Sequence, residues 1–351
     1  MKLSYDVSLR EWNTFGLEVR AAALLEYDSA AELARLLADV RFASELPLPL
    51  LHVGRGSNLL FTGDFPGTVL HSRIRFIEAP QKDPSRPGNV RVRVGAGVVW
   101  DEFCAWAADR GLWGPENLSL IPGEVGAAAV QNIGAYGREV CQLAETVECF
   151  DTLQRRMVVL KGEDCGYGYR NSRFKGEWKG RFVVTAVTFR LTENDGPYLD
   201  YGHVREAVTA ACGPGPWSPA QVRATVAAIR REKLPDPAVT GSAGSFFRNP
   251  VVLPEQYGKV VRTAEQDGLG PVPHFLADDG LIKIPAAWLI EQCGWKGARR
   301  GGAGVWAGQP LVLVNATGSA TPEEIVSLAE AVVGSVRDRF GITLQPEVEY
   351  I

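Results

Sequence analysis

Two glycine-rich stretches constrain this 351-residue chain more than any other feature of its sequence. They read VGRGSNLL at 53–60 and IPGEVGAAAVQNIGAYG at 121–137. Glycine allows backbone conformations in which successive N–H groups point into one concavity, and such a concavity binds phosphate oxygens without a lysine. Neither stretch is a dinucleotide fingerprint: GRGSNL at 54–59, like GAGVVW at 95–100, lacks the third glycine of G-x-G-x-x-G, and a G-x-x-x-x-G-K-[ST] motif is absent. The pair predicts a pocket for a nucleotide with a pyrophosphate; turns between strands are the alternative.

The rest of the chain mixes helical and strand patterns. Apolar residues at helical spacing predict helices over 28–40, 100–111, 218–233 and 321–340. Three of these helices start with predicted capping residues: Ser29 with Glu32, Ser218 with Pro219 in the first turn, and Thr321 with Glu324. Apolar or alternating runs predict strands over 48–54, 90–95, 146–151, 155–160 and 181–191. Residues 114–137 show no periodicity and are expected to be mostly loop, whereas the Gly- and Pro-rich segment 192–217 predicts a domain boundary.

The composition excludes several classes of protein. The net charge is −4, from 37 Lys and Arg against 41 Asp and Glu, so we expect neither a nucleic-acid nor a membrane partner. The chain starts without an apolar signal core and lacks a run of ~18 apolar residues, so the cytoplasm is the expected location. The six cysteines and four histidines are dispersed without ligand spacing, which predicts free thiols and no metal site.

Three further stretches hold reactive groups: CGYGYRNSRFK around Arg170, GSAGSFFRNP around Ser245 and LQPEVEYI around Glu347. Taken singly, the arginine reads as a surface side chain and the glutamate as a solvated acid. Ser245 could be a hydrolase nucleophile, but G-x-S-x-G is absent there and only His274 follows as a possible base. No single stretch therefore identifies a reaction.

Together these stretches resemble one family, the bacterial UDP-N-acetylenolpyruvoylglucosamine reductases. The resemblance rests on NTFGL at 13, GRGSNLLF at 54, ENLSLIPG at 116, QNIGAYG at 131, GYRNSRFK at 168, GSAGSFFRNP at 241, WLIEQCGWKG at 288 and PEVEYI at 346. It implies an α+β fold, with an FAD-binding domain of the vanillyl-alcohol-oxidase (PCMH) type made of two α/β subdomains and a C-terminal α/β substrate domain. The implied limits are 1–75, 76–210 and 211–345, with 346–351 as a tail that returns Glu347 to the active site.

The resemblance also implies the cofactors. FAD would be bound without a covalent link, because the loop Gly54–Asn58 contains no nucleophile, and NADPH would reduce it. The implied FAD-binding residues are Gly54, Arg55, Gly56, Ser57, Asn58, Leu59, Ile121, Pro122, Gly123, Gly126, Gln131, Asn132, Gly134, Ala135 and Tyr136. We expect a monomer.

The implied reaction reduces UDP-N-acetylglucosamine enolpyruvate to UDP-N-acetylmuramate for peptidoglycan. Hydride addition to the enolpyruvyl group leaves an enolate, which Arg170 and Glu347 would stabilise and Ser245 would protonate as a general acid. Glu347 would be held protonated by burial or would act through Arg170. The implied substrate contacts are Tyr201, Lys233, Asn249 and Lys283.

Some positions depart from the family pattern. Arg55 replaces a common glycine, Glu124 a small residue, Ala129 a proline and Trp306 a histidine, and Pro285 interrupts the stretch before Ala286. An acid at 124 near a pyrophosphate would weaken FAD binding by charge repulsion. Two alternatives stay open: a flavin oxidase or dehydrogenase of the same superfamily with another substrate, and a nucleotide-binding protein without activity.

Overall fold

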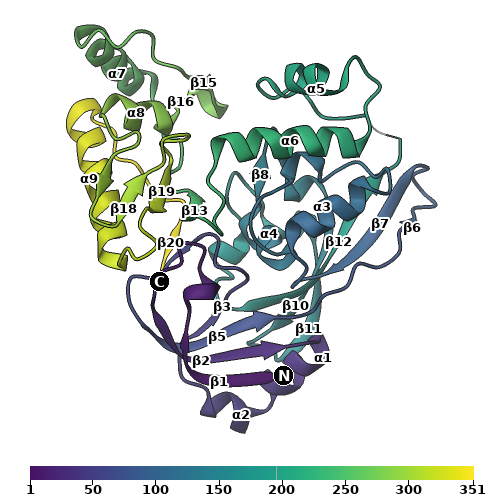
Figure 1. Cartoon of the computed structure of the whole chain (residues 1–351). Helices are drawn as coiled ribbons and strands as arrows, with labels where there is room; N and C mark the ends of the chain where they lie inside the picture. The colour runs from purple at the N-terminus through teal and green to yellow at the C-terminus, as the bar shows by residue number, and fades with distance from the viewer. Residues whose placement is uncertain (195) are drawn as a thin grey trace. The chain divides into compact units, whose positions relative to one another are not determined.

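The structure, a computed structural model, describes residues 1–194 and 196–351 (Figure 1). Contacts divide the chain into two compact units, each built from three segments. Unit 1 comprises Met1–Val7, Ala21–Arg55 and Pro66–Arg230. Unit 2 comprises Ser8–Arg20, Gly56–Phe65 and Arg231–Ile351. The chain therefore passes between the units five times.

These units differ from the predicted limits, because the boundary near residue 210 falls inside unit 1. There α5 (Val204–Cys212) and α6 (Pro219–Lys233) share a small core with Trp113. Arg223 of α6 also donates a 2.7 Å hydrogen bond to Asp101. The division into domains at 75, 210 and 345 stays a prediction.

A four-stranded sheet forms the first part of unit 1. Its order is β1 (Lys2–Ser8), β2 (Arg20–Tyr27), β5 (Phe65–Ser72) and β3 (Leu50–His52), and β3 pairs with β5 in parallel. Helices α1 (Ala30–Ala38) and α2 (Val40–Glu45) follow β2. The predicted cap at Ser29 is confirmed, since its side chain accepts from the Glu32 amide at 3.1 Å. Glu32 itself accepts from the amide of Asp28.

An antiparallel five-stranded sheet forms the second part of unit 1. Its order is β11 (Arg156–Lys161), β10 (Ala144–Asp151), β12 (Phe182–Thr192), β7 (Asn89–Gly95) and β6 (Gln81–Lys82). The predicted alternation in β7 is confirmed: Val92 and Val94 are buried, while Arg93 pairs with Glu148 on β10. Helix α3 (Trp100–Ala108) packs on the sheet, with Phe103 stacked on Phe189 at 4.8 Å.

The expectation that 114–137 is mostly loop is wrong in part. Residues Val125–Gln131 form α4, Glu116–Leu118 form a 3-10 turn, and Gly134–Ala135 (β8) pairs with Arg138–Glu139 (β9). Helix α4 has no recognisable helical period, because it has seven residues, fewer than two full turns, and its sequence VGAAAVQ is almost uniformly small and apolar.

Helices α5 and α6 complete unit 1. The helix predicted over 218–233 is confirmed as α6, and the amide of Gln221 donates to the Ser218 hydroxyl at its start. Helix α5 was not predicted. Its sequence VREAVTAAC has two buried valines, Val204 and Val208, in a segment whose flanks are dominated by glycine and proline.

Unit 2 is built from small sheets and three helices. Its largest sheet is antiparallel, in the order β13 (Gly241–Ser245), β19 (Val312–Asn315), β18 (Ala303–Val305) and β17 (Arg299–Arg300). A second sheet has the order β14 (Val251–Val252), β16 (Ile282–Lys283) and β15 (Phe275–Leu276). Strand β20 (Glu349–Tyr350) pairs in parallel with β4 (Leu59–Leu60).

The three helices of unit 2 are α7 (Pro254–Gln266), α8 (Ala286–Gln292) and α9 (Pro322–Phe340). Helix α9 confirms the predicted capping box, and its predicted apolar stripe is buried. Pro285, which was expected to interrupt its segment, instead lies at the N-cap of α8. A proline is tolerated there because the first helical turn does not need its missing N–H.

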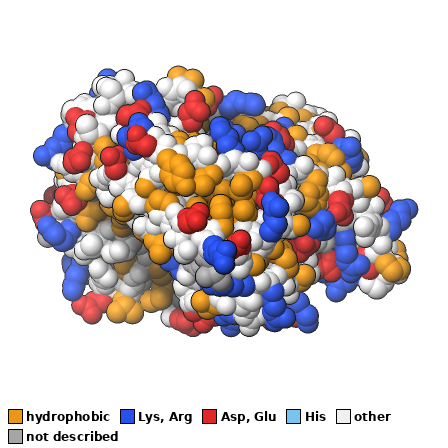
Figure 2. All heavy atoms as spheres, turned by 90° about the horizontal axis from the view of Figure 1, so that it is seen from below, with side chains coloured by type: hydrophobic (Ala, Val, Ile, Leu, Met, Phe, Trp, Pro, Cys, Tyr) orange, Lys and Arg blue, Asp and Glu red, His pale blue; other side chains and the backbone are white. Residues whose placement is uncertain are grey.

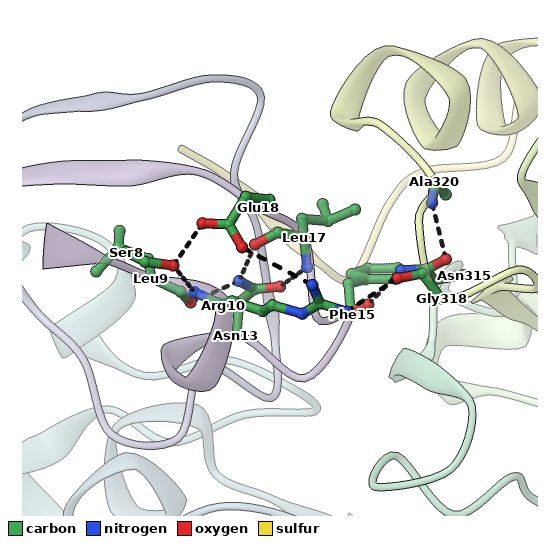
Figure 3. A network of polar contacts seen from close by, with 10 residues as sticks. All are labelled: Ser8, Leu9, Arg10, Asn13, Phe15, Leu17, Glu18, Asn315, Gly318 and Ala320. Atoms are coloured by element: carbon green, nitrogen blue, oxygen red, sulfur yellow. Dashed lines mark hydrogen bonds and ion pairs between the residues drawn. The ribbon is translucent and has the colours of Figure 1, made fainter.

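An N-terminal segment, Ser8–Arg20, belongs to unit 2 and is fixed there by two buried asparagines (Figure 3). Asn13 donates to the carbonyls of Leu9 and Leu17 and accepts from the Leu17 amide, at 2.7, 3.1 and 3.0 Å. Asn315 of β19 donates to the Phe15 carbonyl at 3.0 Å. The NTFGL motif is thus a buried turn held next to β19.

Charges of both signs are interspersed on the face that Figure 2 shows, which agrees with the small net charge. All six cysteines are free thiols, as predicted. None of the described helices is both long and apolar enough to span a bilayer. The described residues also contain no cluster of three or more side chains suited to a metal ion.

Candidate functional site

Ser245 ends β13 with its side chain exposed to solvent. The pairing of β13 with β19 shifts register between Ser242 and Ser245, and Gly244 between them has φ +68°. A positive φ is accessible to glycine without strain, so the strand can turn there. The following Phe246 and Phe247 are fully buried, which holds the exposed serine at a defined place.

Glu347 lies beside this serine strand. Its amide donates to the Phe246 carbonyl at 2.8 Å, and the Arg248 amide donates to Gln345 at 3.0 Å. Phe247 and Pro346 form an isolated antiparallel bridge. The structure therefore brings Ser245 and Glu347 together within unit 2, although 101 residues separate them in the sequence.

The C-terminal tail also holds the first glycine-rich loop. Asn58 donates from its side chain to the Glu347 carbonyl at 3.2 Å and accepts at its own carbonyl from the Glu349 amide at 2.9 Å. Gly56 has φ +62°, and a Cβ there would overlap the carbonyl oxygen of Trp12. The loop can take this path only because residue 56 has no side chain.

The serine strand rests on the NTFGL turn. The Ser242 amide donates to the Thr14 carbonyl at 2.9 Å, and a Cβ at Gly241 would overlap the Phe15 carbonyl. The NTFGL turn therefore supports the GSAGS strand, which ends at Ser245.

Arg170, the third predicted catalytic residue, belongs to unit 1. Its backbone is left-handed, with φ +54°, and its guanidinium donates to the Gly134 carbonyl at 2.7 Å. A Cβ at Gly134 would lie 2.8 Å from the Arg170 Nη1, so the glycine leaves room for the guanidinium. The guanidinium also lies 5.1 Å from the centre of the Tyr169 ring.

Asn132 ties the two loops around Arg170 together. It ends α4 in the left-handed conformation, and its side-chain amide donates to the Gly168 carbonyl and to the Glu139 carboxylate, at 2.9 and 2.8 Å. Ser172 donates to the Val130 carbonyl at 2.6 Å. The QNIGAYG and GYRNS motifs are consequently two sides of one hydrogen-bonded loop pair.

Within unit 1 the two glycine-rich stretches predicted to form a cradle do approach each other. A Cβ at Gly54 would lie 3.1 Å from Glu124 Oε2 and 3.5 Å from the Ala127 Cβ. Residues 123–125 are held against 98–100, because Trp100 donates to Gly123 and Val125 donates to Val98 at 3.0 and 2.9 Å. Gly126 packs closely on Ala96: a Cβ added at Gly126 would lie 2.9 Å from the Ala96 Cβ, which is too close for a side chain.

Glu124, the departure that was expected to weaken FAD binding, is buried in this approach. Burial raises the pKa of its carboxyl to about 8, although Arg55 and Arg75 act in the opposite direction. His71 Nε2 lies 3.9 Å from Glu124 Oε1, and burial lowers the pKa of this histidine. At neutral pH the carboxyl is therefore mainly uncharged, which removes the expected repulsion of a phosphate.

The predicted substrate residues fall in both units. In unit 1 the ring of exposed Tyr201 meets Tyr136 edge to face, with centroids 6.5 Å apart. In unit 2 the Asn249 side chain accepts from the Ala286 amide at 2.9 Å and so caps α8. Lys283 lies on β16, and the Lys233 carbonyl accepts from Trp306 Nε1 at 3.2 Å. Trp306, where a histidine was expected, thus has a structural contact.

Arg230 was not among the predicted site residues, although it lies beside Tyr136, which was predicted to bind FAD. Its guanidinium lies beside the Tyr136 hydroxyl, and burial lowers its pKa while the tyrosine and Asp101 act in the opposite direction. Its Nε is buried without a hydrogen-bond partner among the described residues. Its inward orientation could have been predicted from sequence, because Arg230 follows the apolar residues Val222 and Val226 at four-residue spacing and so continues the inward face of α6.

Comparisons with known proteins now decide the family. Two sequence profiles match: an FAD binding domain over residues 21–154 and the C-terminal domain of UDP-N-acetylenolpyruvoylglucosamine reductase over residues 236–351. A UDP-N-acetylenolpyruvoylglucosamine reductase of Bacteroides fragilis is 47% identical over 98% of both chains. One of Porphyromonas gingivalis is 43% identical over the whole of both chains. This chain belongs to the UDP-N-acetylenolpyruvoylglucosamine reductase family.

The solved structures agree with this family. The crystal structure of the UDP-N-acetylenolpyruvylglucosamine reductase from Thermus caldophilus matches with a TM-score of 0.66 at 25% identity, covering 100% of this chain and 99% of that one. The predicted α+β class with an FAD-binding domain of the vanillyl-alcohol-oxidase type is confirmed. As a member of the reductase family, the chain is an FAD-dependent oxidoreductase.

The described residues fit FAD. The FAD-binding profile spans both glycine-rich stretches, and these meet at Gly54, where a side chain would fill the space against Glu124 and Ala127. The Glu124 carboxyl, which lies next to Gly54, is mainly uncharged at neutral pH because burial raises its pKa to about 8.

Proposed function

We propose that this chain reduces UDP-N-acetylglucosamine enolpyruvate to UDP-N-acetylmuramate with NADPH as the hydride donor, in the cytoplasm and as a monomer. The observation that carries the proposal is the placement of Glu347 beside Ser245, on a strand and a tail hydrogen-bonded to each other, in a chain of the reductase family. The product is a peptidoglycan precursor.

When bound, FAD would take a hydride from NADPH and supply it to the terminal carbon of the enolpyruvyl double bond. The chain would hold FAD without a covalent link at Gly54–Leu59 and at the residues of 121–136 named above. The Gly54 approach, the glycine requirement at Gly56 and the left-handed Asn132 support these assignments, because each fixes the backbone path of a loop that would bind the cofactor.

Arg170 would bind the carboxylate of the enolpyruvyl group and stabilise the enolate that forms there. Its planar guanidinium can donate two parallel hydrogen bonds to a carboxylate. The bond to Gly134 and the contact with Tyr169 restrict the side chain, so less freedom is lost when the substrate binds.

Ser245 would protonate the enolate carbon as a general acid. Its exposed hydroxyl, held by two buried phenylalanines, supports this role, and the absence of a G-x-S-x-G elbow argues against a nucleophile. Glu347 would act beside it on the same substrate group. Tyr201, Lys233, Asn249 and Lys283 would contact the UDP group, Asn249 with the amide nitrogen that its cap of α8 leaves unused.

An anaerobic experiment tests the proposed reaction. The flavin absorbance of the FAD-loaded chain is bleached with one equivalent of NADPH, and UDP-N-acetylglucosamine enolpyruvate is then added. We expect the yellow colour to return as UDP-N-acetylmuramate forms. Bleaching without return would mean an oxidoreductase with another substrate, the main alternative, and the roles of Ser245, Arg170 and Glu347 would be withdrawn.

A further inference from the structure

Glu124 is the unusual group at the place where the two glycine-rich stretches meet. Its Oε2 lies 3.1 Å from the position of a Cβ on Gly54, so the carboxyl stands directly behind the loop backbone. The residue is 7% exposed and is fixed at the start of α4, where it forms a bridge with Val99. A charge on this carboxyl would therefore act on an anion bound at the loop.

The groups around Glu124 come from three other segments of unit 1. Arg55 follows the loop glycine, His71 lies on β5, Arg75 follows β5, and Tyr27 lies on β2. His71 is itself fixed, because its Nδ1 lies 3.0 Å from the Val53 carbonyl and must donate to it. A neutral His71 therefore carries no proton on Nε2, the atom nearest to Glu124.

Because a nearby phosphate is negatively charged, an ionised Glu124 would oppose its binding, whereas a protonated one would not. The burial that raises the pKa of Glu124 to about 8 makes the protonated form the main one at neutral pH. The ionised form becomes the main one only above that pH. Cofactor affinity and the protonation of this carboxyl are then linked.

We propose that FAD binds this chain together with a proton on Glu124, so that the carboxyl acts as a proton-dependent gate on cofactor affinity. The inference rests on the proposed placement of the FAD pyrophosphate at Gly54. It concerns binding alone, and its test needs no turnover.

The direction of the pH dependence follows from the thermodynamic linkage between FAD binding and protonation of Glu124. Below the pKa of Glu124 the carboxyl is already protonated, and the FAD dissociation constant is independent of pH. Above it, binding must take up a proton, so the dissociation constant rises toward about tenfold per pH unit. His71 does not produce the change between pH 7 and pH 9, because burial lowers its pKa from the ordinary value of 6.5 and leaves it neutral there. The pKa of Tyr27 is raised by burial, so it too stays neutral.

The test measures FAD dissociation constants on the FAD-stripped chain between pH 6 and pH 9, from the quenching of flavin fluorescence. We expect wild type to weaken at least several-fold between pH 7 and pH 9, whereas Glu124→Gln, a neutral side chain of the same shape, stays constant. Glu163→Gln serves as the matched control, because Glu163 is exposed and pairs with Lys161, and it should follow wild type. Ionisation of the flavin itself is common to all variants.

Calorimetry gives an independent readout. In buffers of different ionisation enthalpy, wild type should take up a proton when it binds FAD near pH 8.5, and Glu124→Gln should not. Glu124→Ala must behave as Glu124→Gln does, which protects the test if one variant folds poorly. A pH-independent wild type, or a pH dependence shared by wild type and both variants, would overturn the gate while leaving FAD binding intact. Failure of wild type to bind FAD at any pH would overturn the cofactor site as well.

Discussion

The amide of Glu347 donates a 2.8 Å hydrogen bond to the carbonyl of Phe246, the residue that follows Ser245. This bond joins the last residues of the chain to the strand of the candidate general acid. The same tail binds Asn58 in the first glycine-rich loop. One short segment therefore positions two of the proposed catalytic residues and part of the proposed cofactor loop.

Ser245→Ala separates the two half-reactions. Flavin reduction by NADPH should proceed at the wild-type rate, because the hydroxyl has no part in it. Reoxidation by UDP-N-acetylglucosamine enolpyruvate should slow by about 10²- to 10⁴-fold, the usual contribution of a positioned general acid. Stopped-flow absorbance of the flavin measures both steps, with Ser335→Ala on α9 as the control. Equal losses in both half-reactions would remove Ser245 from the proton-transfer role.

Arg170→Lys keeps the positive charge and removes the planar fork. Because lysine cannot make two parallel hydrogen bonds to a carboxylate, kcat/KM for the enolpyruvyl substrate should fall by about 10²-fold or more. FAD affinity should stay at the wild-type value. Gly134→Ala should show a smaller loss of the same kind, since its Cβ would press on the guanidinium. Unchanged kinetics in Arg170→Lys would contradict a role in carboxylate binding.

Asn13→Ala tests the buried turn of Figure 3. The substitution removes three hydrogen bonds and leaves the carbonyls of Leu9 and Leu17 without that donor. Unfolding free energy should fall by about 2–4 kcal/mol, as expected when buried polar groups lose their partners. Urea titration measures the loss, and Ser8→Ala, which breaks two exposed bonds, to Glu18 and to the Arg10 amide, should cost under about 0.5 kcal/mol. Similar losses in the two variants would argue against a buried anchor.

Gly56→Ala introduces both a clash with Trp12 and a left-handed conformation for alanine. The conformation alone costs about 1–2 kcal/mol, and the clash adds to it. Thermal unfolding should therefore shift down by several degrees, with weaker FAD binding. Gly63→Ala is the matched control, because no atom lies within 4 Å of its Cβ position and its φ is not in the left-handed range. Comparable stability of both variants would show that the loop adapts.

Acid should weaken unit 1 through Asp151. The Arg181 guanidinium donates to its carboxylate at 2.7 Å and lowers its pKa below the usual range. A group with a lowered folded pKa stabilises the fold at neutral pH and loses that contribution as pH falls through the folded value. The stability difference between wild type and Asp151→Asn should thus shrink below pH 4. Urea midpoints measured from pH 2 to pH 7 check this, and a constant difference would contradict it.

Much of this architecture follows from local patterns. Capped amphipathic helices such as α6 and α9, and strands such as β7 with its alternating valines, could be predicted because each pattern extends over several turns or pleats. Helix α4 could not, because seven small residues carry no period, and α5 was hidden among glycines and prolines. The catalytic positions came from a family resemblance, whereas Arg230 needed the contact with Tyr136 to be noticed.

The contacts of Glu124 depend on tertiary structure in the same way. From sequence alone, an acid in a phosphate-binding loop predicts repulsion of the phosphate. The burial of Glu124 and its distance from His71 could not be predicted, because they are set by chain segments far from residue 124. The histidines also seemed dispersed, yet β3 and β5 place His52 and His71 on neighbouring strands.

The buried turn at Asn13 also restricts how unit 2 can form during synthesis. The Phe15 carbonyl accepts a hydrogen bond from Asn315, which is synthesised 300 residues later. Folding in order from the N-terminus, as domains commonly fold during synthesis, is thus available to unit 1 but not to unit 2. The Phe15 carbonyl lacks its Asn315 donor until β19 is made, and Leu59 and Leu60 lack their strand partner until residues 349–351 are made. A nascent chain that has released only its first 300 residues therefore carries two segments of unit 2 that are not yet fully paired, with side chains such as Phe15, Leu17 and Leu60 that the finished unit buries.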